Sequence, residues 1–213
     1  MAPIRKGDGT PLEIPGVSEV RSGDGRVFFD AIPDSEDFEH NDLTGNYGGD
    51  TDSFAIQSEN VDEGSFALEI QATDFAWITR STEQAWDRDG LRISWRQNSS
   101  DTQTGGGLAV ATSVTGADDV DGYAFLFNPS GGTTRRLRRY DNGSDTSLDD
   151  SAASATSGAW VDCSVEFDGE SIVYQSDGET LTANDNTYTQ LYLAFHGFDT
   201  DTFIDGVTFE EID

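Results

Sequence analysis

Apolar residues alternate with polar residues along most of this chain, which is the pattern of β-strands with one buried and one solvent-facing side. In residues 65–70, Phe66, Leu68 and Ile70 are separated by Ser65, Ala67 and Glu69, and a glycine before them fits a turn. No segment has an apolar period of 3.6 residues over the length of a helix. The pattern therefore predicts an all-β protein.

Gly, Asn, Asp or Ser separates nearly every pair of predicted strands, so the strands should be short, antiparallel and joined by turns. A short strand at Asp37-Phe38-Glu39 is predicted to open the main domain. The strands predicted after it are 53–57, 65–71, 76–80, 91–97, 107–113, 122–128, 135–140, 159–167, 171–175, 179–183, 190–196 and 202–210. This spacing indicates a β-sandwich or jelly roll and argues against a parallel α/β fold.

Residues 1–33 differ from the rest of the chain because they contain a short internal repeat. Gly7-Asp8-Gly9 returns as Gly23-Asp24-Gly25, and each copy is a turn signal followed by an extended run. A segment of this size cannot bury enough apolar surface alone. Residues 1–33 are therefore predicted to be a docking module, with residues 34–213 as the main domain. The competing interpretation is an ordinary N-terminal β extension whose strands join the main sheet.

The composition adds an unusual charge to this picture. The chain has 213 residues and a formal net charge of −29, with Lys6 as its one lysine against 41 acidic residues. Aromatic residues make up 11% of the chain and fall in periodic runs, so the chain is predicted to fold. A folded protein with this charge repels itself at low ionic strength, and high salt screens that repulsion. The composition therefore predicts adaptation to high salt, and it argues against nucleic acid or an anionic membrane as partners.

The sequence also gives no indication of a membrane span or of a reactive thiol. The first residues lack the apolar segment of a signal peptide, and no stretch approaches the roughly 20 apolar residues of a membrane span. Cys163 is the single cysteine and alternates with apolar residues in its segment, so we expect a small buried hydrophobic side chain there.

Several segments together resemble the concanavalin A-like lectin/glucanase superfamily, and more narrowly its laminin-G-like jelly rolls. The resemblance covers roughly residues 34–213 and lies in the following segments: Asp37-Phe38-Glu39, Glu63 to Glu69, Asp121-Gly122-Tyr123, Ala159-Trp160-Val161 and Phe203 to Val207. The repeated Gly-Asp-Gly module resembles N-terminal segments of virion proteins from tailed viruses of haloarchaea. These resemblances imply a laminin-G-like jelly roll carried by a virion structural protein.

The implied role is that of a capsid turret, spike or tail fibre used for adhesion to the host surface. Other virion proteins would bind residues 1–33, and a host glycan or glycoprotein would bind the jelly roll. A homo-oligomer located on the extracellular particle is expected, since such appendages are symmetric. The alternative is a carbohydrate-binding module of a secreted or surface protein from a halophilic archaeon.

Hydrolase activity is not expected. Glucanases of the superfamily carry three acids on one strand in the order Glu-x-Asp-x-x-Glu. Glu166-Phe167-Asp168 begins in this way, but Glu170 comes one residue too early for the third acid.

The resemblance also implies a structural Ca²⁺ where the first and last strands meet. The matching positions are Glu39, Asp62 and Asp205, with carbonyls of the 62–65 turn as further oxygen ligands. The competing interpretation is that these acids are solvated surface groups, as most acids in so acidic a chain must be.

A glycan site would need aromatic rings beside amide or carboxylate groups. Trp86 and Asp87 lie in a loop-like segment, and Tyr140 and Asn142 lie at a strand end. These four residues are the predicted glycan contacts, although packing is the stronger expectation for Trp86.

The densest basic patch is Arg135-Arg136-Leu137-Arg138-Arg139. On a strand, Arg136 and Arg138 would face one way and Arg135, Leu137 and Arg139 the other. In so acidic a chain, we expect these arginines to pair with carboxylates.

Overall fold

A computed structural model of the chain describes residues 35–72, 74–82, 85–99, 105–114, 116–128, 134–198 and 201–212, together with the backbone of 21–23 and 26–28. The chain divides into two units, Met1–Ile32 and Pro33–Asp213. In the first unit, β1 (Arg21–Gly23) and β2 (Arg26–Phe28) pair as an antiparallel hairpin at the second Gly-Asp-Gly. The first Gly-Asp-Gly lies outside the described residues.

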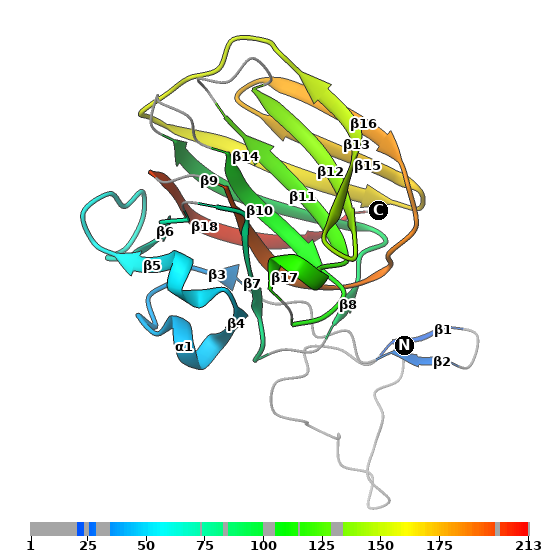
Figure 1. Ribbon diagram of the computed structural model, residues 1–213. Coiled ribbons are helices and arrows are strands. Elements are labelled where there is room, and N and C mark those ends of the chain that lie inside the picture. The colour runs from blue at the N-terminus through cyan, green and yellow to red at the C-terminus, as the bar shows by residue number, and fades with distance from the viewer. Residues whose placement is uncertain are drawn as a thin grey trace, which may run out of the picture. The chain divides into compact units, whose positions relative to one another are not determined.

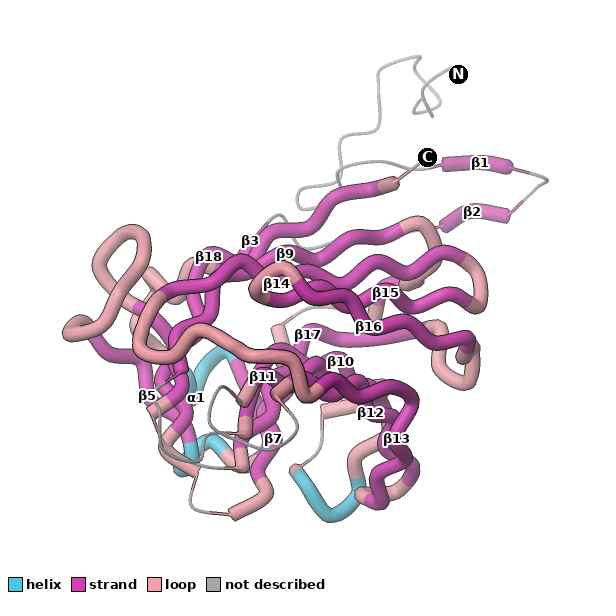
Figure 2. Tube along the Cα trace, turned by 90° about the horizontal axis from the view of Figure 1, so that it is seen from above, coloured by secondary structure: helices cyan, strands magenta, loops and turns pink. Residues whose placement is uncertain are grey.

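The second unit is a sandwich of two antiparallel sheets, which confirms the predicted fold class (Figures 1 and 2). The first sheet has the order β13 (Ser144–Ser151), β12 (Arg135–Asp141), β11 (Gly122–Phe127), β10 (Gly106–Ala111), β17 (Gln190–Gly197), β7 (Ala76–Arg80), β4 (Tyr47–Gly49), and β8 (Trp86–Asp87) pairs with β17. The second sheet has the order β16 (Glu179–Asn184), β15 (Ser171–Ser176), β14 (Trp160–Asp168), β9 (Leu91–Ser99), β18 (Thr202–Glu211), β6 (Ala67–Ile70), β5 (Phe54–Gln57), and β3 (Ser35–Glu36) pairs with β18.

Helical structure is limited to short segments in the described residues: α1 (Leu43–Asn46) and the single 3₁₀ turns η1 (Thr51–Ser53) and η2 (Ala117–Asp119). No helix among the described residues is long and apolar enough to cross a membrane.

The main core lies between the sheets and is built from aromatic rings. Trp95 of β9 stacks on Tyr174 of β15 with ring centroids 6.0 Å apart. Phe125 of β11, from the opposite sheet, packs against both Tyr174 and Phe167 of β14. The predicted alternation is confirmed here, because Leu91, Ile93 and Trp95 are buried whereas Arg92 and Arg96 are partly exposed. Cys163 is buried in this core, as predicted, and burial raises the pKa of its thiol to about 12.

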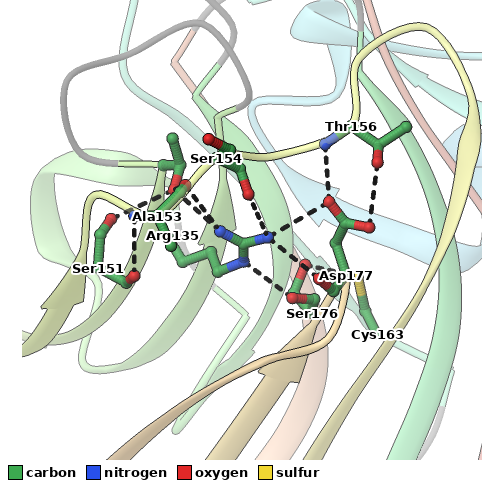
Figure 3. Close-up of polar contacts among 9 residues, drawn as sticks. Arg135, Ser151, Ala153, Ser154, Thr156, Cys163, Ser176 and Asp177 are labelled. Atoms are coloured by element: carbon green, nitrogen blue, oxygen red, sulfur yellow. Dashed lines mark hydrogen bonds and ion pairs between the residues drawn. The ribbon is translucent and has the colours of Figure 1, made fainter.

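The arginine patch on β12 pairs with carboxylates, as expected. Arg138 lies 3.0 Å from Asp150, and Arg139 lies 2.6 Å from Asp185. Arg135 points between the sheets, where it is fully buried and reaches the β15–β16 turn of the second sheet (Figure 3).

The segment Asp37-Phe38-Glu39 is not a strand, which corrects one prediction. The strand is formed instead by Ser35 and Glu36, which pair with β18. Phe38 follows in the left-handed region at φ 59°, and its N–H donates to the buried Glu36 carboxylate at 2.8 Å. This turn buries the Phe38 ring beside Phe195.

Candidate functional site

The two sheets differ in how much of their outer face is open to solvent. On the first sheet, the outward residues Trp77, Ala109, Ala124 and Ala194 are all buried, in a cluster closed over by Ala117 and Val120. On the second sheet, the outward side chains remain exposed or half-exposed: Arg92, Ser94, Arg96, Asp162, Ser164, Gln175 and Phe203. Among the described residues, the second sheet therefore has the more open outer face.

A pocket of about 600 Å³ lies on this open face, where the loop after β5 meets β6 and β18. We call it the loop pocket, and its lining residues are Gln57, Ser58, Glu59, Asn60, Glu69 and Phe203. Phe203 precedes the buried Ile204 on β18, so the strand alternation turns its half-buried ring outward. The loop pocket thus combines one aromatic ring with amide, hydroxyl and carboxylate groups.

The loop that forms this pocket is shaped by the amide of Gln57. Gln57 Oε1 accepts hydrogen bonds from the N–H groups of Glu59 and Asn60 at 2.6 and 2.9 Å, and its Nε2 donates to the Asn60 carbonyl at 2.7 Å. Asn98 of β9 donates to Asn60 Oδ1 at 3.3 Å. The loop that forms the pocket wall is therefore fixed to the sheet by hydrogen bonds.

Two carboxylates from distant segments fasten the next part of the same loop. Asp205 Oδ2 accepts from the N–H groups of Asp62 and Glu63, both at 3.0 Å, and its Oδ1 accepts from Gly206 N–H at 2.8 Å. Glu39 Oε1 accepts from the N–H groups of Ser65 and Phe66. Burial raises the pKa of Asp205, and the three N–H donors oppose that shift.

These same acids were predicted as calcium ligands, and the structure brings Glu39, Asp62 and Asp205 to one turn as expected. Their oxygens, however, face backbone N–H groups instead of lying among carbonyls, and Asp62 Oδ1 lies 3.5 Å from Arg96. Among the described residues, no group of three or more His, Cys, Asp or Glu could hold a metal. The arrangement fits a hydrogen-bonded latch and does not fit a calcium cage.

The predicted glycan contacts lie elsewhere. Trp86 is 1% exposed in β8 and packs edge-on against Phe209, in agreement with packing as the stronger expectation for this ring. Asp87 follows it and accepts a hydrogen bond from Asp89 N–H. Tyr140 is 3% exposed within the aromatic cluster on the first sheet, and Asn142 occupies a turn at φ 48°. The structure does not bring Trp86 and Tyr140 to an open surface, because each ring completes a hydrophobic cluster.

Comparisons with known proteins identify the fold. No family model matches the chain, and no curated protein matches its sequence. Among solved structures, the carbohydrate binding module CBM66 from Bacillus subtilis matches with a TM-score of 0.56 and 12% identity, over 75% of this chain and 96% of that one. A Bacteroides ovatus mixed-linkage glucan GH16 protein in complex with a G4G4G3G product matches with a TM-score of 0.56 and 10% identity, over 83% and 99%.

The VIP36 exoplasmic/lumenal domain, in a Ca²⁺/Man3GlcNAc-bound form, matches with a TM-score of 0.51 and 14% identity, over 80% of this chain and 90% of that one. Likeness at these identities concerns the fold alone. The chain has the jelly-roll β-sandwich fold of these structures.

Proposed function

We propose that the chain is a glycan-binding protein and that it binds sugar at the loop pocket. The observation that carries this proposal is the half-exposed Phe203 ring, set among amide and carboxylate groups in a pocket of about 600 Å³. Sugar rings present an apolar face that stacks on an aromatic ring and hydroxyls that both donate and accept hydrogen bonds. The fold shared with a carbohydrate-binding module supports the same class of ligand.

We expect Phe203→Ala to weaken binding to immobilised neutral polysaccharide about tenfold, since an aromatic contact contributes about 1 kcal/mol or slightly more. Phe203→Tyr should retain binding because the ring remains. Phe198→Ala is the matched control, because Phe198 is 55% exposed and does not line the pocket. The measurement is retention on laminarin, mannan and mixed-linkage glucan columns at high salt. Retention of none of them, or equal retention of the Phe203→Ala and unaltered proteins, would contradict the proposal.

The proposed role is binding without hydrolysis. Glu166, the first acid of the incomplete glucanase-like triplet, is ion-paired with Arg92, whose Nε lies 2.8 Å from its Oε1. Arg92 also reaches Glu210 at 3.1 Å, so Glu166 belongs to a surface ion-pair network on three adjacent strands. Release of reducing sugar in the binding assay would contradict this part of the proposal.

We further propose that the protein is located on a virus particle as a homo-oligomeric turret, spike or tail fibre. Residues 1–33 would be its docking module. Support comes from the sequence and from the hairpin β1–β2, which belongs to a unit separate from the sandwich. The alternative is a carbohydrate-binding module of a secreted or surface protein. A chain lacking residues 1–33 should still fold and bind glycan but should fail to join particles. Its normal incorporation would favour the alternative.

A further inference from the structure

A second pocket, of about 450 Å³, lies on the same open face of the second sheet. We call it the sheet pocket. It extends over β9, β14 and the β15–β16 hairpin, and its polar lining includes Ser94, Arg96, Asp162, Ser164, Gln175 and Glu179. The proposed function above does not use this pocket.

Strand β18 borders both pockets. Phe203 lines the loop pocket and Gly206 lines the sheet pocket. Three residues along a strand span about 10 Å, so the two pockets are neighbours. Gly206 has a φ of 57° at a break in register between β18 and β9, and no atom lies within 4 Å of where its Cβ would be. Gly206 therefore adds no side chain at the edge of the sheet pocket, whereas Asp205, between Gly206 and Phe203, is buried beneath the 62–63 turn.

An ion pair also connects the sheet pocket to the loop that forms the loop pocket. Arg96 lines the sheet pocket and lies 3.5 Å from Asp62, which belongs to the loop that forms the loop pocket. Arg96 further lies 3.4 Å from Asp162 on the opposite side. The loop, the latch at Asp205 and the sheet pocket are thus fixed relative to one another through one arginine.

The chemistry of the sheet pocket resembles that of the loop pocket in its hydrogen-bonding groups. Ser94, Ser164, Thr180 and Gln175 make no side-chain hydrogen bond to any described residue, and hydroxyl and amide groups can each donate and accept. Sugar hydroxyls need partners of this kind.

The charge of both pockets is negative. Glu59 and Glu69 line the loop pocket, and Asp162 and Glu179 line the sheet pocket. The one cation in either lining, Arg96, is already paired with carboxylates. Together with the net charge of −29, this field repels an anionic polymer and leaves a neutral one unaffected.

We propose that the loop pocket and the sheet pocket are two subsites of one groove, which binds a neutral polysaccharide along its chain and rejects acidic polysaccharides. This inference rests on the proposed glycan binding and extends it to the class and length of the ligand. A ligand that fills both pockets gains contacts that a disaccharide in one pocket lacks.

The test measures affinity by calorimetry for laminari-, cello- and manno-oligosaccharides from disaccharide to octasaccharide. Affinity should rise about tenfold or more with length and then level off. Gln175→Ala should remove much of this rise, lowering octasaccharide affinity severalfold and disaccharide affinity much less. Thr182→Ala is the matched control, because Thr182 is an exposed residue of β16 outside the pocket lining. Polygalacturonate should not bind at low salt.

The outcomes separate the two proposals. If no neutral polysaccharide or oligosaccharide binds, the proposed function itself fails. If Phe203→Ala abolishes binding but affinity is independent of length and of Gln175, the loop pocket stands and the two-subsite groove is overturned. Binding of polygalacturonate as tight as that of the neutral polymers would overturn the charge-based exclusion.

Discussion

Replacing Arg135 with methionine is expected to lower the free energy of unfolding by about 3–5 kcal/mol, because it removes one partner from a buried, fully hydrogen-bonded charge network. Arg135 is 0% exposed. Methionine keeps the apolar stem of the side chain, so the loss reports mainly on the guanidinium. The measurement is denaturant unfolding at constant high salt, followed by tryptophan fluorescence.

The expected loss of stability follows from the number of groups that the Arg135 guanidinium hydrogen-bonds. Its Nε donates to the Ser176 carbonyl at 2.8 Å, and its Nη1 donates to Thr134 Oγ1 and the Ala153 carbonyl at 3.0 and 3.2 Å. Its Nη2 lies 3.3 Å from the Asp177 carboxylate, which also accepts from Thr156 N–H (Figure 3). Arg135 therefore joins β12 of the first sheet to the β15–β16 turn of the second sheet and to the segment after β13.

Arg138→Met is the matched control on the same strand. Arg138 points to the opposite face, and its partners Asp145 and Asp150 have side chains that are 57% and 38% exposed. Pairs of this kind contribute about 1 kcal/mol or less. Arg135→Lys should recover only part of the lost stability, since an ammonium group cannot reproduce the planar set of donors. Equal losses for the Arg135→Met and Arg138→Met proteins would contradict the predicted contribution of the buried Arg135 network.

The strands of the sandwich were predictable where one face is buried and the other is wet. Strand β7 has the predicted bounds, Ala76–Arg80, because its flanking turn residues end the apolar run. Strand β13, Ser144–Ser151, was missed because it is an edge strand with one apolar residue, and its pairing with β12 comes from backbone hydrogen bonds that leave no side-chain pattern. The two-residue strand β8 at Trp86 was missed for the same reason, because two residues are too few to show an alternating side-chain pattern.

The site was harder to predict than the fold. Phe203 lies in a predicted strand, and its outward position follows from the alternation with Thr202 and Ile204. An aromatic residue at a solvent-facing strand position was therefore a signal available in the sequence. The pocket around Phe203 could not be predicted from the sequence. The loop that forms it is held over the sheet by a hydrogen bond from Asp62 N–H to Asp205, a residue 143 positions later. Glu39 and Asp205, which were predicted as calcium ligands, lie at this loop and accept hydrogen bonds from its backbone N–H groups.

The second large effect is expected from pH, through His196. The imidazole is 1% exposed on the outer face of the first sheet, edge-on to Trp77 and Phe75, with Nε2 3.3 Å from the Tyr140 hydroxyl. Burial lowers the pKa of His196 to about 3. In the unfolded chain the same group takes up a proton near its ordinary pKa of 6.5.

Because only the unfolded state binds this proton between those two pKa values, the contribution of His196 to stability is complete above pH 6.5 and falls as the pH is lowered toward 3. From pH 7 to pH 5 the loss should be about 2 kcal/mol, before most carboxylates titrate. His196→Gln should lower stability at pH 7 but remove this part of the pH dependence. His40 is present in both proteins, so the difference between their slopes belongs to His196.

Tyr140→Phe is the control for this measurement, because it removes the hydroxyl near Nε2 without exposing the imidazole. We expect a less stable protein that keeps the slope of the unaltered chain between pH 7 and pH 5. The free energy of unfolding at a series of pH values and constant salt provides the comparison. If the His196→Gln protein showed the same slope as the unaltered protein, His196 would have to be charged in the folded state. The aromatic cluster would then have to open enough to hydrate the imidazole, and a closed outer face of the first sheet would no longer support placing the proposed glycan site on the second sheet.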